Sequence, residues 1–248
     1  MKQEINTFLS LEDAAKEASA WILARLRAAL VARTACSLVL SGGSSPKALY
    51  RSLAREYADD PVWRKVCFFW GDERLVPPED KRSNYGMALR VLLEPLGIPE
   101  NRIFRIPAEL PGKNSAEAYA RTVGNWLSAN GAGGFDVTIL GLGGDGHTAS
   151  LFPDSPALAD DFYSGGDPLV IPVPAPVMEP RVPRVTMTLP LLRRSASLVF
   201  FVAGGMGGGK KSILDRCRAS GFRPTADIPA TLAVRDRSAA WFICGEEA

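Results

Sequence analysis

Short apolar runs that end in glycine-rich or polar turns alternate with amphipathic segments, and this alternation constrains the fold more than any other feature of the chain. The apolar runs are typical of buried strands and lie at 35–40, 66–70, 135–140, 198–202 and 241–244. The intervening segments predict helices at 11–32, 46–57, 84–93, 115–127 and from Lys210 onward. Strands that alternate with helices predict an α/β fold, a mainly parallel Rossmann-like sheet with helices on both faces.

One segment departs from this alternation. Prolines crowd residues 153–184, where we expect a long, semi-rigid connection around one short strand at 169–173, of the kind that often covers a site. The chain has 248 residues, of which 46% are hydrophobic, and this is enough for a core without disulfides or metals. No internal repeat or linker divides the sequence, so we expect a single domain spanning 1–248.

The composition excludes several classes of function. The 29 basic and 27 acidic residues leave a net charge of +2, without the basic excess typical of nucleic-acid-binding proteins. No run reaches the ~18 apolar residues of a membrane span, and the polar first residues do not resemble a signal peptide. The 4 cysteines lie far apart and form no CxxC pair, which indicates a reducing compartment. We therefore expect a cytoplasmic protein, a monomer or weak homodimer, with a small-molecule partner and neither nucleic acid nor membrane.

The first candidate site is the loop Ser-Gly-Gly-Ser-Ser-Pro-Lys that follows the predicted strand at 35–40. Gly42 and Gly43 allow the backbone to approach an anion closely. Ser44, Ser45 and the start of the next helix offer N–H and O–H donors to a phosphate. The spacing matches neither the dinucleotide fingerprint nor the Walker loop, which favours a mononucleotide or a sugar phosphate. Alone, this loop is also compatible with an ordinary strand-to-helix turn.

Further charged residues follow other predicted strands. Asp72 and Arg74 suit polar recognition and charge stabilisation, but they are also compatible with a solvated turn that holds a local ion pair. The glycine-rich run before Lys210 nearly matches a Walker loop, but Lys211 replaces the magnesium-binding Ser or Thr. This run therefore indicates either a phosphate contact or a flexible loop. Arg184 could bind phosphate in a bidentate manner, although without context it is typical of a surface residue.

The strongest candidate for a catalytic residue is His147, the single histidine of the chain. It follows the strand at 135–140 and a glycine-rich turn, and we expect it to begin the next helix. A helix N-terminus disfavours the imidazolium form, which would keep the ring neutral and able to act as a base. Asp145 lies two residues before it and could orient the ring. Single histidines are more often structural, but the glycine-rich position at a strand end favours catalysis here.

These motifs, in this order, resemble the 6-phosphogluconolactonases, of the superfamily that includes glucosamine-6-phosphate deaminase. The resemblance rests on residues 41–47, 70–77, 83–85, 141–153 and 184–186, of which 141–153 is the most specific. It implies hydrolysis of 6-phospho-D-glucono-1,5-lactone in the oxidative pentose phosphate pathway, without a metal or an organic cofactor. It also implies that His147 is the family histidine.

The chemistry of the residues and the resemblance together predict the site. The predicted catalytic residues are His147, Asp145, Asp72 and Arg74. The predicted substrate- and phosphate-binding residues are Gly42, Gly43, Ser44, Ser45, Asn84, Gly144, Arg184 and Lys210. The choice between Lys210 and Lys211 stays open, because the glycine run before them is longer than the family's usual turn. The end of the chain lacks an aspartate common in the family, which we expect to affect packing rather than chemistry.

A δ-lactone is an activated ester, so we expect positioning, a base and an oxyanion partner rather than a covalent nucleophile. Neutral His147 would accept a proton from the attacking water and later protonate the ring oxygen. Two alternatives remain open. A glucosamine-6-phosphate deaminase uses a glutamate five residues after the histidine, where this chain has Phe152. A sugar-phosphate sensor normally carries an added DNA-binding helix-turn-helix, for which the sequence before residue 11 leaves no room.

Overall fold

A six-stranded sheet forms the centre of the protein, which is described here from a computed structural model covering residues 2–203 and 209–245. Each pair of neighbouring strands in this sheet is parallel. The strand order is β1 (Glu4–Phe8), β9 (Ala239–Cys244), β8 (Ser197–Val202), β5 (Val137–Leu140), β2 (Cys36–Leu40) and β3 (Val66–Trp70). The predicted parallel α/β sheet is thus confirmed, whereas β1 was missed at the sequence level.

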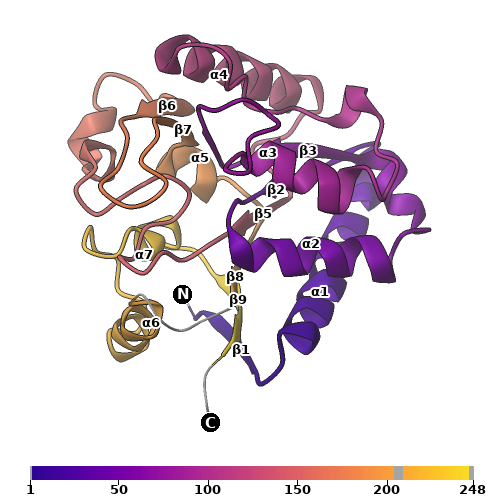
Figure 1. Ribbon diagram of the computed structural model, residues 1–248, viewed down its shortest axis with the longest axis horizontal. Coiled ribbons are helices and arrows are strands. Elements are labelled where there is room, and N and C mark those ends of the chain that lie inside the picture. The colour runs from indigo at the N-terminus through magenta and orange to yellow at the C-terminus, as the bar shows by residue number, and fades with distance from the viewer. Residues whose placement is uncertain (1, 204–208, 246–248) are drawn as a thin grey trace.

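Helices cover both faces of this sheet, which is why its central strands are continuous apolar runs. α1 (Leu11–Ala32) and α2 (Ser44–Glu56) lie on one side, and α5 (Leu189–Arg193) and α6 (Lys210–Ala219) lie on the other (Figure 1). On the α6 side, the ring of Trp241 stacks on Phe200 with centroids 3.8 Å apart and contacts Phe222. Strand side chains therefore fill the space beneath the helices.

The remaining helices complete the two outer layers. Trp126 of α4 (Gly112–Ala129) packs edge-on against Phe69 of β3, with ring centroids 5.2 Å apart. The predicted helix at 84–93 is α3 (Asn84–Ala88) continued by a π-helical turn at Leu89–Leu93. The other short helices are α7 (Pro229–Ala233) and 3-10 turns at Pro61–Lys65, Glu100–Arg102, Pro156–Leu158 and Asp160–Tyr163.

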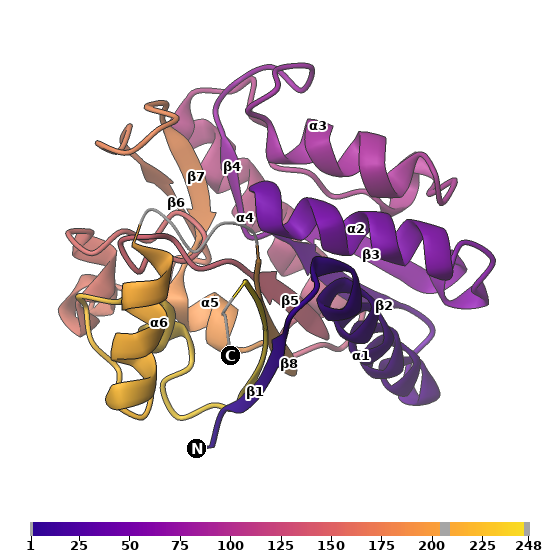
Figure 2. The ribbon, with the colours of Figure 1, turned by 60° about the horizontal axis from the view of Figure 1, so that its bottom comes forward.

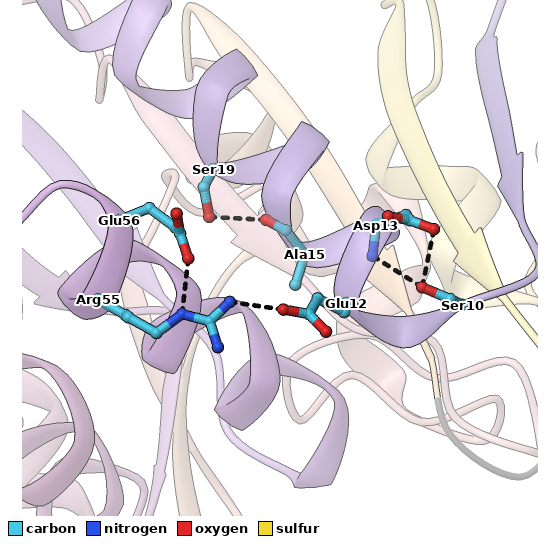
Figure 3. A network of polar contacts seen from close by, with 7 residues as sticks. All are labelled: Ser10, Glu12, Asp13, Ala15, Ser19, Arg55 and Glu56. Atoms are coloured by element: carbon cyan, nitrogen blue, oxygen red, sulfur yellow. Dashed lines mark hydrogen bonds and ion pairs between the residues drawn. The ribbon is translucent and has the colours of Figure 1, made fainter.

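The start of α1 is fixed by a side-chain cap, shown in Figure 3. Ser10 Oγ accepts the N–H of Asp13 at 3.0 Å, and the Ser10 hydroxyl is 2.9 Å from Asp13 Oδ2. The N-cap serine satisfies one of the unpaired N–H groups of the first turn. In the same view, Arg55 of α2 donates to Glu12 of α1 at 2.8 Å and to Glu56 at 2.6 Å. This exposed ion-pair cluster links the two helices and contributes only modestly to stability.

A second, three-stranded sheet lies beside the large one, and it was not predicted. Its order is β4 (Asp72–Arg74), β7 (Arg184–Met187) and β6 (Val170–Val173), with antiparallel pairs throughout. Figure 2 shows β4 and β7 side by side, above and away from β1. Of these strands only β6 was expected, at 169–173. Arg184, which the sequence predicts to be a phosphate-binding residue, is only 3% exposed and pairs across the ladder with Arg74.

Within residues 2–203 and 209–245, no helix combines the length and the apolar character needed to cross a bilayer.

Candidate active site

A cavity of about 250 Å³ opens where several strands of the large sheet end. The sheet order places β2 and β5 next to each other, with β3 beside β2 on one side and β8 beside β5 on the other. Such a switch point is where open α/β sheets bind ligands. The cavity is lined by Ser41, Gly42, Gly43, Ser44, Ser45, Pro46, Asp72, Arg74, Gly141, Leu142, Gly143, Gly144, His147, Ala149, Met178, Arg184 and Lys210. The structure thus brings together the predicted residues from five separate motifs, with Asp145 beside His147 and Asn84 behind Asp72.

The loop after β2 forms one wall of the cavity. Gly43 has φ +101° and ψ −179°, a conformation that residues with a Cβ rarely adopt. Gly43 precedes α2, whose first-turn N–H groups receive no side-chain cap. Ser44 and these N–H groups are therefore available to an anion. The hydroxyl of Ser45 is instead hydrogen-bonded to the backbone oxygen of Ala203, so it fastens the loop to the end of β8.

The histidine turn, residues 141–152, forms another part of the cavity wall. His147 Nδ1 lies 2.5 Å from Asp145 Oδ1, and the His147 backbone N–H donates to the same oxygen at 3.1 Å. A Cβ on Gly143 would lie 2.0 Å from His147 Nδ1, so only glycine permits this packing. The predicted orienting role of Asp145 therefore has the required geometry.

The expected helix after His147 is absent, which corrects the sequence-based argument for a neutral ring. The N–H of Gly143 donates to the carbonyl of His147 at 2.9 Å, and the turn continues into a bridge between Thr148 and Leu151. Ala149 has φ +49°, which is incompatible with a right-handed helix. His147 therefore does not lie at the N-terminus of a helix, and the argument from a helix dipole does not apply to this turn. The contact with Asp145 selects the tautomer of the ring instead.

The carboxylate of Asp145 responds to its surroundings in two opposing ways. Burial raises its pKa, but the hydrogen bonds and the charge of His147 outweigh burial and hold the pKa of Asp145 below its ordinary value. An ionised Asp145 accepts the Nδ1–H of His147, which leaves Nε2 of the neutral ring with a free lone pair. The pair can therefore accept a proton at Nε2.

Phe152 contacts both His147 and Arg184. Its ring centroid is 4.7 Å from that of His147, with the two planes tilted by 41°. The guanidinium carbon of Arg184 is 5.3 Å from the same ring. The phenyl ring thus packs against the imidazole and also provides a cation–π contact for the arginine.

Two arginines from the small sheet carry buried N–H groups without partners among the described residues. Arg74 donates from Nη1 to the Arg82 carbonyl at 2.8 Å, and Arg184 donates from Nη2 to the Pro180 carbonyl at 3.1 Å. The Nε atoms of both arginines are buried and have no hydrogen-bond acceptor there. Burial lowers the pKa of Arg184, with Asp72 opposing and Arg74 reinforcing the shift. Buried donors normally find acceptors, so these side chains are suited to an anionic ligand.

Asn84 stands behind the cavity wall rather than among the residues that line it. Its Nδ2 donates to the Asp72 carbonyl at 2.9 Å, and its side chain fills the space where a Cβ of Gly42 would be. Glu73, which sequence reasoning did not select, accepts the N–H groups of Asn84 at 2.8 Å and Tyr85 at 2.7 Å. Burial raises the pKa of Glu73, while these backbone donors oppose the rise. Glu73 therefore anchors the start of α3 to β4.

The two candidate lysines point to different surfaces. Lys210 lines the cavity, and burial lowers its pKa, whereas Lys211 is exposed and borders a separate hollow on α6. This geometry favours Lys210 as the cavity lysine. The predicted glycine-rich phosphate loop falls largely on 204–208, outside the described residues. Gly144 lies close to the start of α6, because a Cβ on Gly209 would lie 2.4 Å from the carbonyl oxygen of Gly144.

Three further residues around the cavity were not among the predicted site residues, although Phe152 had been noted in place of the deaminase glutamate. Met178 lines it from the proline-rich segment, Phe152 packs on His147, and Ser150 is hydrogen-bonded to Asp72. The only available signal was that Ser150 and Phe152 fall within the specific run 141–153. No three His, Cys, Asp or Glu side chains gather as a metal site in residues 2–203 and 209–245.

The fold and the cavity define a class, that of α/β enzymes in which a histidine–aspartate pair and cationic groups share a pocket at the strand ends. Within this class the chain belongs to the family of glucosamine-6-phosphate isomerases/6-phosphogluconolactonases, whose model matches residues 10–241. The resemblance drawn from the sequence motifs is thereby confirmed.

Individual relatives agree with this assignment. The chain is 35% identical over 209 residues to the 6-phosphogluconolactonase of Synechocystis sp., covering 82% of this chain and 81% of the relative. It is 39% identical over 212 residues to that of Rhizobium meliloti, covering 84% of each. The crystal structure of 6-phosphogluconolactonase from Thermotoga maritima matches with a TM-score of 0.79 at 28% identity, covering 98% of this chain and 100% of that one. The Trypanosoma brucei enzyme matches with a TM-score of 0.77 at 28% identity, covering 98% and 96%.

Proposed function

We propose that the chain hydrolyses 6-phospho-D-glucono-1,5-lactone to 6-phospho-D-gluconate in the pentose phosphate pathway, with His147 as the base. The observation that carries the proposal is the 2.5 Å contact between Asp145 Oδ1 and His147 Nδ1 in a cavity lined by Arg74, Arg184 and Lys210. The pair of Asp145 and His147 suits proton transfer, and the three cationic side chains suit a phosphorylated substrate. Family membership and relatives named 6-phosphogluconolactonase support this substrate.

The reaction needs one proton acceptor that becomes a proton donor. With Nδ1–H bound to Asp145, Nε2 of His147 takes a proton from water as the water oxygen bonds to C1 of the lactone. The bond between C1 and the ring oxygen then breaks, and the imidazolium returns its proton to that oxygen. One water is consumed and one carboxylic acid forms, so the histidine ends in its starting state. General acid–base catalysis of this kind contributes typically ~10²–10⁴-fold.

The other residues would bind and stabilise the substrate. Arg74 or nearby backbone N–H groups would stabilise the oxyanion at C1, and Asp72 would accept a hydrogen bond from a sugar hydroxyl. Ser44, Arg184 and Lys210 would hold the phosphate, aided by the first turn of α2. Binding at this remote group supplies free energy for the alignment of the lactone carbonyl with His147.

The alternative reaction, deamination of glucosamine 6-phosphate, lacks support from the residues around His147. Phe152 occupies the position of the glutamate used in that branch, and its ring packs against the imidazole with centroids 4.7 Å apart. A phenyl ring cannot relay a proton.

A kinetic assay tests the proposal. Disappearance of the lactone is followed against its spontaneous hydrolysis, with and without the 6-phosphate, for the wild type, His147→Ala and Lys211→Ala. We expect strong catalysis of the phosphorylated lactone by the wild type and by Lys211→Ala, because Lys211 is exposed outside the cavity. We expect His147→Ala to lose roughly 10²–10⁴-fold in kcat/KM. Near-full activity of His147→Ala, or ammonia release from glucosamine 6-phosphate, would overturn the proposal.

We also propose a cytoplasmic location and a single functional domain. The 4 cysteines, at 36, 67, 217 and 244, are all free and buried, which suits a reducing compartment. Buried side chains of both sheets belong to one hydrophobic cluster, which suits a single domain.

A further inference from the structure

Ser150 makes a short hydrogen bond that joins the histidine turn to the small sheet. Its side chain is fully buried, and its hydroxyl lies 2.5 Å from Oδ2 of Asp72 on β4. Its backbone N–H donates to Oγ1 of Thr186 on β7 at 3.2 Å. Ser150, three positions after His147, therefore contacts both strands that carry Asp72, Arg74 and Arg184.

Asp72 depends on this bond for its orientation. It is 4% exposed and lines the cavity, yet its other oxygen, Oδ1, has only a long contact of 3.4 Å with Nδ2 of Asn84. The Ser150 hydroxyl is thus the one close side-chain donor to this carboxylate among the described residues. Bonds from a neutral donor to an ionised acceptor are short and comparatively strong, so Ser150 selects the rotamer of Asp72.

Thr186 in turn holds Ser150 in register. The Thr186 hydroxyl is 3.1 Å from the Met187 carbonyl, to which it donates, and this leaves lone pairs to accept the Ser150 N–H. Thr186 is fully buried and pairs with Asp72 across the β4–β7 ladder. The three residues form a closed buried network, in which loss of one member releases the others.

From this geometry we propose that Ser150 is a positioning residue for the reaction, whose hydroxyl holds Asp72 so that Oδ1 faces the sugar. This inference rests on the proposed lactonase function. Ser150 itself does not line the cavity and touches no substrate. Its influence passes through Asp72, and it fixes the distance between the sugar-binding carboxylate and the turn that carries His147.

A double-mutant cycle tests the inference. Ser150→Ala is expected to lower kcat/KM about tenfold, mainly through KM, because a hydrogen bond to a charged group of the binding site is lost. In an Asp72→Ala background the same substitution is expected to have no further effect, since the acceptor is gone. Ser150→Cys, which keeps a weak donor, is expected to fall between the wild type and Ser150→Ala, and it replaces Ser150→Ala if that variant does not fold.

Ser195→Ala is the matched control. Ser195 is also fully buried, and its hydroxyl lies 2.8 Å from Thr138 Oγ1, but its partner Thr138, unlike Asp72, does not line the cavity. We expect it to change thermal stability without changing KM. The inference is wrong if Ser150→Ala keeps the wild-type KM, or if its effect multiplies fully with that of Asp72→Ala.

Failure of the proposed function is a separate outcome, and it would show as a wild-type protein that does not hydrolyse the lactone faster than the spontaneous reaction. Because the predicted effect of Ser150 is on binding, the same cycle is then measured by calorimetry with 6-phosphogluconate as the probe. Equal affinities of the wild type and Ser150→Ala in that titration overturn the inference. Weaker binding by Ser150→Ala, with an effect that is not additive with that of Asp72→Ala, supports it.

Discussion

Oδ1 of Asp145 lies 2.5 Å from Nδ1 of His147 and also accepts the backbone N–H of the same residue, so one carboxylate oxygen fixes both the ring and its main chain. The two side chains are only partly exposed, at 29% for Asp145 and 23% for His147. A partly dry environment of this kind strengthens the hydrogen bond and its control over the tautomer.

Asp145→Asn tests that control. The amide can donate to Nδ1, which places the ring proton on Nε2 and removes the base, so kcat is expected to fall roughly 10²–10⁴-fold, as for triad aspartates. KM is expected to change little. Steady-state kinetics checks this result, with Asp215→Asn on the exposed face of α6 as the control. A variant with wild-type kcat would show that Asp145 does not set the tautomer.

Gly143→Ala tests the close packing under the imidazole. The new Cβ would lie 2.0 Å from His147 Nδ1 and 2.7 Å from Asp145 Oδ1, so the ring must move. A displacement of about 1 Å at a reacting group costs on the order of 10²-fold in rate. Gly133→Ala is the control, because a Cβ there meets no atom within 4 Å. Comparable kcat values for the two variants would contradict this account.

The pH dependence of ligand binding tests Lys210. Burial lowers the pKa of Lys210 from the ordinary 10.5, so its positive charge disappears as pH rises, at a lower pH than for an exposed lysine. The affinity for 6-phosphogluconate should therefore weaken as the pH approaches 10.5 from below. Lys210→Arg should keep its affinity over the same range, because guanidinium stays charged. Calorimetric titrations across this range decide the matter, and parallel curves for both proteins would exclude Lys210 from phosphate binding.

Phe152→Leu tests the ring that contacts both His147 and Arg184. The substitution keeps an apolar side chain but removes the contacts at 4.7 Å to the imidazole and 5.3 Å to the guanidinium. Aromatic contacts contribute about 0.5–1.5 kcal/mol, so kcat is expected to fall by a few-fold to about tenfold. Phe162→Leu, at a ring that is 41% exposed, is the control. Equal kcat values for wild type and Phe152→Leu would restrict Phe152 to a packing role.

The large sheet was predictable because its strands are continuous apolar runs that end in glycine-rich turns. β1 was not, because Glu4–Phe8 mixes polar and apolar residues at the edge of the sheet and is recognisable only through its pairing with β9. β4 and β7 are short, and they pair across more than a hundred residues. Local periodicity carries no signal for such contacts.

The sequence predicted which residues belong to the site better than it predicted how they are arranged. Carboxyl ends of neighbouring parallel strands converge, so Ser44, Asp72, Arg74 and His147 could be grouped from sequence position alone. The helix expected at His147 was wrong because the turn closes on itself, from the Gly143 N–H to the His147 carbonyl. The bond from Ser150 to Asp72 joins residues 78 positions apart, which no local motif encodes.

The direct pairing of Arg74 with Arg184 across β4 and β7 has a consequence for the lifetime of the molecule. Like charges placed opposite each other on neighbouring strands repel, and an anionic ligand in the cavity would relieve this repulsion. A ligand that binds only the folded chain adds RT ln(1 + [L]/Kd) to its stability. The ligand-free protein is then the form that heat unfolds and proteases degrade first. The rate at which the enzyme is degraded in a cell would therefore depend on the supply of its phosphorylated ligand.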